Sequence, residues 1–106
     1  MGPDMIKGTL TLIVLLLLTQ QALAWGGCPP ARWDFPYRGK LTVEYLDGAE
    51  FTARCGPSPF LGFMAACAFI GRGSCRVVIH KSSPNPACSL RHEIAHCNGW
   101  PRSHPQ

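Results

Sequence analysis

The chain has 106 residues and a mass of 11.6 kDa, which leaves room for one small domain. Its formal net charge of +4 comes from basic residues scattered singly along the sequence. We interpret them as a solvated surface with a weak preference for acidic envelopes or polymers and no nucleic-acid signal. A multidomain enzyme, a coiled coil and a cytosolic nucleotide-binding fold are excluded, the last because the sequence has no glycine-rich phosphate loop.

Residues 1–24 have the order of a secretory signal peptide. Lys7 is followed by an apolar run from Leu10 to Leu18 and by a small-residue cleavage site at Ala22-Leu23-Ala24. The apolar run is shorter than the roughly 20 residues that a membrane-spanning helix needs. We therefore expect cleavage after Ala24, a secreted or periplasmic location, and a mature domain over residues 25–106. A retained signal anchor is the alternative, and membrane contact would then go through this segment alone.

All six cysteines lie after the cleavage site: Cys28, Cys55, Cys67, Cys75, Cys88 and Cys97. Six cysteines in a small exported domain indicate an oxidising compartment and a fold stapled by up to three disulfides. A domain of this size buries too little surface to be comfortably stable without such help. The sequence does not choose among the fifteen pairings that six cysteines allow.

The first half of the mature chain predicts an arm, a hairpin and an apolar core element. Residues 25–37, rich in Pro, Gly and aromatic types, indicate an extended arm that Cys28 would tether to the body. Residues 41–46 and 49–54 alternate apolar and polar types around Asp47-Gly48, which predicts a β-hairpin. Residues 60–70 are almost wholly apolar, which favours a buried helix or compact buried turn over a membrane-active segment.

The second half predicts a further strand and a C-terminal helix. A turn at residues 71–74 leads into an apolar strand over residues 75–81. Asn85 and Pro86 form a helix start signal, and Asn98-Gly99 followed by Pro101 forms a stop signal, so residues 86–97 are predicted to be helical. The expected fold is thus α+β: a small, monomeric, disulfide-stapled domain with a hairpin, an additional strand and this helix.

The predicted helix contains the sequence His92-Glu93-Ile94-Ala95-His96. Histidines four residues apart lie one turn apart on the same helical face, so both imidazoles can reach one ion, and neutral imidazole is a preferred zinc ligand. Glu93 follows the first ligand and is placed to exchange protons with a water molecule there. The pattern therefore predicts zinc held by His92 and His96, with Glu93 as the general base. Solvated histidines with no metal are the alternative.

The stretch from Leu90 to His104 resembles the active-site helix and following turn of the zincin (HExxH) metallopeptidases. Gly99, three residues after His96, is similar to the metzincin glycine turn, HExxHxxGxxH, which brings back a third histidine. The resemblance implies a zinc peptidase in which His92 and His96 are ligands and Glu93 is catalytic. The chain departs from the metzincin pattern because Arg102 occupies the third-ligand position and the next histidine is His104.

We expect His104 to be the third metal ligand. His80, a carboxylate of the predicted hairpin and Cys97 are the competitors, and we expect Cys97 to be half of a disulfide instead. The strand over residues 75–81 is predicted to lie beside the active helix, where an extended peptide substrate would pair with it.

Two functions follow from these observations. The first is a secreted zinc peptidase that acts on a peptide or protein substrate, which could belong to the cell envelope. The second is a secreted disulfide-rich binding or structural module, such as an envelope or secretion accessory, with a structural metal or none. A structural zinc site is closed by four protein ligands, whereas a catalytic one keeps a position open.

Overall fold

The computed structural model describes residues 27–58 and 64–106. The expected signal peptide and the first part of the apolar run at residues 60–70 lie outside the described residues. Within the described ranges no helix is long and apolar enough to cross a membrane. The predicted α+β class and the disulfide stapling are both confirmed.

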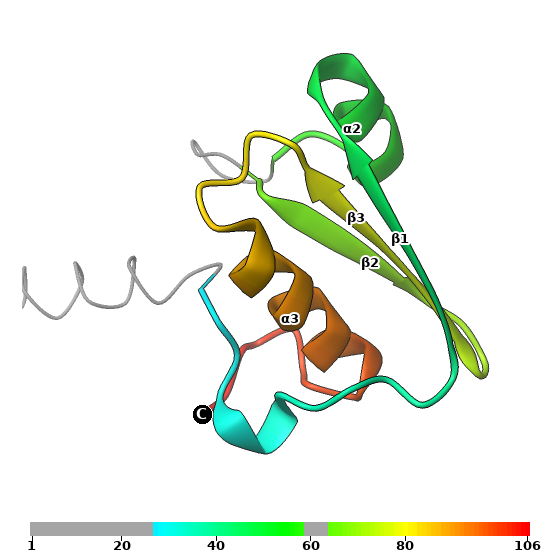
Figure 1. The fold of residues 1–106 in the computed structure, drawn as a ribbon, viewed down its shortest axis with the longest axis vertical. Helices are drawn as coiled ribbons and strands as arrows, with labels where there is room; N and C mark the ends of the chain where they lie inside the picture. The colour runs from blue at the N-terminus through cyan, green and yellow to red at the C-terminus, as the bar shows by residue number, and fades with distance from the viewer. Residues whose placement is uncertain (1–26, 59–63) are drawn as a thin grey trace, which may run out of the picture.

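The described residues form six elements (Figure 1). They are the 3-10 helix η1 (Ala31–Trp33), β1 (Lys40–Leu46), α2 (Gly48–Cys55), β2 (Ala66–Ile70), β3 (Ser74–His80) and α3 (Pro86–Cys97). The three strands form one sheet in the order β1-β3-β2. The central strand β3 is parallel to β1 and antiparallel to β2.

The core lies between the central strand and α3. Cys75, Val77 and Ile79 alternate along β3 on the face that α3 covers, and all three are buried. Leu90 and Ile94 of α3 pack against them, four residues apart on one helical face. This contact leaves the opposite side of α3 free to build a site.

The predicted hairpin over residues 41–54 is wrong. Residues 41–46 do form β1, but the second half is the helix α2, which begins just after Asp47. Phe51 of α2 is buried and its ring lies 4.8 Å from that of His80, on the sheet face away from α3. Because β1 pairs in parallel with β3, the chain needs a long crossover between them, and α2 occupies part of it.

The apolar run also has a different structure from the one we expected. Its described part is residues 64–70, and residues 66–70 of it form strand β2 rather than a helix or compact turn. A short apolar run is compatible with a strand or with a helix. Here residues 66–70 form a strand, which pairs with one edge of β3. The real β-hairpin of the fold is β2–β3, whose turn at residues 71–73 coincides with the predicted turn. In that turn Gly73 takes a positive φ of 67°.

The predicted strand at residues 75–81 and the helix at residues 86–97 are confirmed as β3 and α3. β3 is not an edge strand, however. It is hydrogen-bonded on both sides, so the expectation that a peptide substrate pairs with it is wrong.

Three disulfides join distant parts of the chain: Cys28–Cys88, Cys55–Cys67 and Cys75–Cys97. The first ties the arm to α3, as expected of Cys28. The second ties α2 to β2, and the third ties the central strand to the end of α3. All six cysteines are paired, which is in keeping with an oxidising, extracellular environment.

Candidate metal centre

Local signals define both ends of α3. The side chain of Asn85 accepts a hydrogen bond from the Cys88 backbone N–H at 3.2 Å, and Pro86 occupies the first turn, where an N–H would have no partner. At the other end Gly99 has a φ of 104°, a left-handed conformation that favours glycine.

The C-terminal cap also builds part of the site. The Gly99 N–H donates to the His96 carbonyl, and the Trp100 N–H donates to the Ala95 carbonyl, each at 3.0 Å. These two bonds form a Schellman motif, which reverses the chain just after the helix. The reversal brings the Trp100 carbonyl to 2.7 Å from Nδ1 of His96.

Three imidazoles meet on the side of α3 away from the sheet. The Nε2 atoms of His92, His96 and His104 lie 3.2–3.3 Å from one another. His104 arrives from a turn in which its N–H donates to the Pro101 carbonyl at 3.0 Å. Its φ of 58° is unusual for a residue other than glycine, although histidine is among the types that tolerate it best. The chain thus accepts local strain where it completes the cluster.

In two of these rings, a contact between Nδ1 and a backbone carbonyl determines which ring nitrogen carries the proton. Nδ1 of His92 lies 2.8 Å from the Gly27 carbonyl, and Nδ1 of His96 faces the Trp100 carbonyl. A carbonyl oxygen only accepts, so both Nδ1 atoms carry the proton and donate it. In the neutral rings both Nε2 atoms then present lone pairs, which face each other and repel unless a cation lies between them.

The cluster fits a tetrahedral metal ion. With zinc–nitrogen bonds of about 2.0–2.1 Å, two ligands of a regular tetrahedron are about 3.3–3.4 Å apart. The observed separations of 3.2–3.3 Å are close to that value. His92, His96 and His104 therefore form a group that could hold a metal ion, and contacts from the outer ring nitrogens to backbone carbonyls are typical of histidine ligands.

Burial favours the neutral, metal-binding form of two of these rings, those of His92 and His104. It lowers the pKa of His92 to about 4, against the opposing effect of its hydrogen bond to Gly27. The pKa of His104 is also lowered, first by burial and then by the neighbouring His96. At neutral pH both rings are consequently neutral and no proton competes strongly for Nε2.

Trp100 packs against all three histidines. Its ring centroid lies 4.8 Å from that of His96, nearly parallel to it, and 4.9 Å from those of His92 and His104. The side chain is only 6 % exposed, and its Nε1–H donates to the Pro105 carbonyl at 2.8 Å. The indole thus backs the cluster and also anchors the C-terminal tail that carries His104.

Glu93 lies on the flank of α3 between the histidines and the sheet, since successive helical residues are about 100° apart. Its side chain is buried, and that burial alone raises its pKa to about 7. A carboxyl group that titrates near neutrality can both accept and release a proton.

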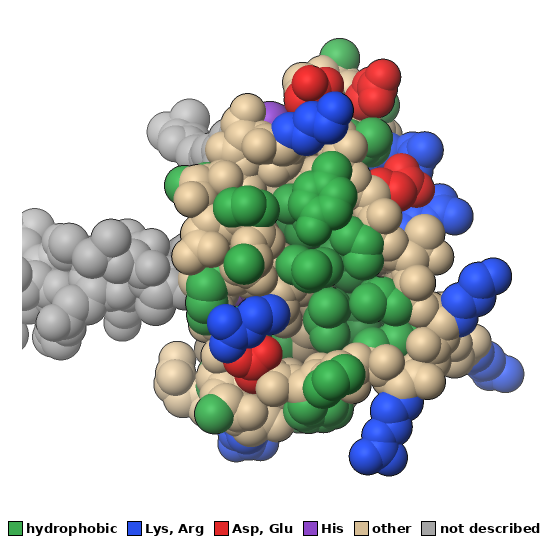
Figure 2. All heavy atoms as spheres, in the orientation of Figure 1, with side chains coloured by type: hydrophobic (Ala, Val, Ile, Leu, Met, Phe, Trp, Pro, Cys, Tyr) green, Lys and Arg blue, Asp and Glu red, His purple; other side chains and the backbone are tan. Residues whose placement is uncertain are grey.

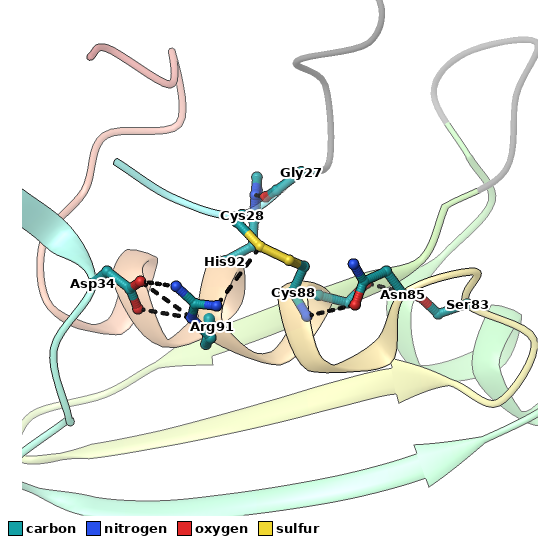
Figure 3. The surroundings of a disulfide bond; sticks show 9 residues. Gly27, Cys28, Asp34, Ser83, Asn85, Cys88, Arg91 and His92 are labelled. Atoms are coloured by element: carbon teal, nitrogen blue, oxygen red, sulfur yellow. Dashed lines mark hydrogen bonds and ion pairs between the residues drawn. A yellow bond between two sulfur atoms is a disulfide. The ribbon is translucent and has the colours of Figure 1, made fainter. Parts of the chain in front are cut away.

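The arm holds one side of the cluster in place (Figure 3). The Cys28–Cys88 disulfide joins it to the first turn of α3, and the Arg91 guanidinium pairs with the Asp34 carboxylate on the arm. Gly27, which accepts from His92, directly precedes Cys28. The disulfide therefore positions a carbonyl that orients one of the three imidazoles.

The structure brings together the three histidines that we expected as ligands, and the group that could hold a metal ion among the described residues contains none of the competitors. His80 packs on Phe51 at the other face of the sheet, and Cys97 is bonded to Cys75. The sequence did not assign the Gly27 and Trp100 carbonyls, because backbone acceptors carry no side-chain signal. The sequence analysis also assigned no role to Trp100, and its place directly after Gly99 was the only hint.

Comparison of the chain with protein-family models, curated proteins and solved structures finds no match.

Proposed function

We propose that the protein is a secreted or periplasmic zinc peptidase of zincin type. The observation that carries the proposal is the convergence of three imidazoles at separations that suit tetrahedral zinc. Zinc held there by His92, His96 and His104 would supply Lewis acidity and make hydroxide available near neutral pH.

A site with three protein ligands fits a catalytic zinc ion better than a structural one. Structural zinc sites have four protein ligands, whereas catalytic sites keep one position for water or substrate. Among the described residues the group has three members, of which His96 and His104 are only half-buried. Solvent and a substrate carbonyl therefore have a route to the cluster.

Glu93 is the residue that we assign to proton transfer. It is adjacent to a ligand in the sequence, and its carboxyl group is buried rather than held in a surface ion pair. Its role would be to take a proton from the attacking water and return it to the leaving amine of a peptide or protein substrate.

One observation favours a second function, a disulfide-rich module with a structural metal. His104 comes from the C-terminal tail, and Trp100 fastens that tail to the cluster from behind. A metal there would close the tail onto α3 even if no reaction occurred.

The decisive variant is Glu93→Gln, with Glu50→Gln on the exposed surface of α2 as its matched control. We expect the oxidised wild type to bind one zinc ion per chain and to cleave a peptide library. Glu93→Gln should keep the zinc and lose hydrolysis by about 10²–10⁴-fold, whereas Glu50→Gln should keep both. Zinc binding without hydrolysis in the wild type would favour the structural module, and full turnover in Glu93→Gln would refute the assigned base.

A further inference from the structure

One end of the sheet carries basic and apolar side chains that the metal centre does not use. We call it the basic hairpin end: Phe69 and Ile70 at the end of β2, Arg72 in the β2–β3 turn, Arg76 on β3, Lys40 at the start of β1 and Arg38 just before it. These parts are adjacent, because Lys40 pairs with Ser74 and its N–H donates to the Gly73 carbonyl at 2.9 Å. Gly39 lies so close to that carbonyl that a Cβ there would come within 2.6 Å of it.

The charge at this end has one sign. Arg38, Lys40, Arg72 and Arg76 are all exposed. Of the five Asp and Glu side chains in the described residues, only Glu44 comes near this end. Its carboxylate pairs with Arg54 at 3.0 Å and lies 3.9 Å from Arg76. In Figure 2 the end at lower right, where Figure 1 places the β2–β3 turn, bears Lys and Arg side chains and no acidic ones.

Apolar side chains stand among these cations. Phe69 is 48 % exposed and Ile70 is 56 % exposed, and they immediately precede the turn. They border a hollow of about 370 Å³ that is also lined by Lys40, Thr42, Ser74 and Arg76. The hollow combines two cations, two hydroxyls and an apolar wall, which suits a phosphate group attached to an apolar body.

We propose that the basic hairpin end docks the protein on an anionic lipid surface. Phe69 and Ile70 enter the headgroup region, the four cations contact lipid phosphates, and the hollow receives one headgroup phosphate. A soluble anionic polymer would satisfy the cations but would leave the apolar pair in water. This surface adds a membrane contact to the one we expected only from an uncleaved signal segment, and it shares no residue with the histidine cluster.

The test is binding of the oxidised protein to vesicles of mixed phosphatidylcholine and phosphatidylglycerol, with phosphatidylcholine vesicles alone for comparison. The charge variant is Arg72→Gln/Arg76→Gln, and its matched control is Lys81→Gln/Arg102→Gln, which removes the same charge at exposed positions elsewhere. Each cation at an anionic surface strengthens binding by about fivefold, so the charge variant should bind about 25-fold more weakly and the control should change much less. The variants share one N-terminus, so any contribution from it cancels.

A second variant, Phe69→Ser/Ile70→Ser, separates a membrane from a soluble anion. It should lose about tenfold in vesicle binding while its retention on heparin stays unchanged, and inorganic phosphate should compete only weakly with vesicles. The proposal would be overturned if the protein bound neutral and anionic vesicles equally well, or if the charge variant and its control lost the same affinity for anionic vesicles. Vesicle binding that is indifferent to the apolar pair would assign this end to soluble anions instead.

Discussion

Replacing His104 gives the most direct test of the metal centre. His104→Asn removes one imidazole but keeps a residue type that tolerates the left-handed backbone at this position, where φ is 58°. Four-ligand zinc sites bind with about 10–16 kcal/mol, or about 2.5–4 kcal/mol per ligand. The variant should therefore bind zinc about 10²–10³-fold more weakly than the wild type.

The same loss appears in thermal stability. At a zinc concentration of 100 times the wild-type Kd, binding stabilises the folded wild type by about 2.7 kcal/mol, which for a domain this small raises Tm by about 10–20 °C. If the variant binds 100-fold more weakly, the same concentration stabilises it by about 0.4 kcal/mol and raises Tm by about 2–3 °C.

The assay is calorimetric titration of zinc into the metal-free oxidised protein, followed by melting with and without zinc. His80→Asn is the control, because His80 packs on Phe51 outside the cluster. The reasoning would be refuted if the wild type bound no zinc, if His104→Asn bound it with unchanged affinity, or if His80→Asn lost as much.

Three further predictions concern the surroundings of the cluster. Trp100→Phe removes the hydrogen bond to Pro105 and part of the stacking on the rings, so we expect a loss of about 1–2 kcal/mol in unfolding free energy and about tenfold in zinc affinity; unchanged affinity in a zinc titration would contradict the supporting role of the indole. Burial holds the pKa of His92 at about 4, below the roughly 6.5 of an unfolded chain, so the unfolded state binds more protons between these values. The unfolding free energy of the metal-free protein should therefore contain this contribution in full above about pH 6.5 and lose it as the pH falls toward 4. Urea unfolding at a series of pH values measures this, and the same pH dependence in His92→Gln would exclude His92 as the cause. Opening the Cys75–Cys97 disulfide with a double alanine variant frees a loop with a sequence separation of 22, which should cost about 3 kcal/mol in urea unfolding; a much smaller loss would mean that packing alone holds α3 on β3.

The helix and the histidine pair were predictable from the sequence because their determinants are local. Asn85, Pro86 and Gly99 act within a few residues of the backbone groups that they satisfy. The spacing of His92 and His96 fixes their common face by helical geometry alone. The cysteine count likewise predicted a stapled domain, although not the pairing.

The hairpin over residues 41–54 and the helix or turn over residues 60–70 failed for the opposite reason. Alternation and apolar content predict which side chains will be buried, but they do not predict which strand or helix will pack against them. The β3 edges are filled by β1 in parallel and by β2 in antiparallel, and this pairing decides that Gly48–Cys55 is a crossover helix and Ala66–Ile70 a strand.

The complete site belongs to the tertiary structure. Only the Schellman turn, the packing of Trp100 and the arm tied by Cys28–Cys88 bring His104 and two backbone carbonyls to the helix pair. The Gly27 carbonyl, for example, is 65 residues from the His92 ring that it contacts. Local propensity specified the two histidines on one helix, whereas the position of the third histidine and of the groups that orient the rings depends on long-range packing.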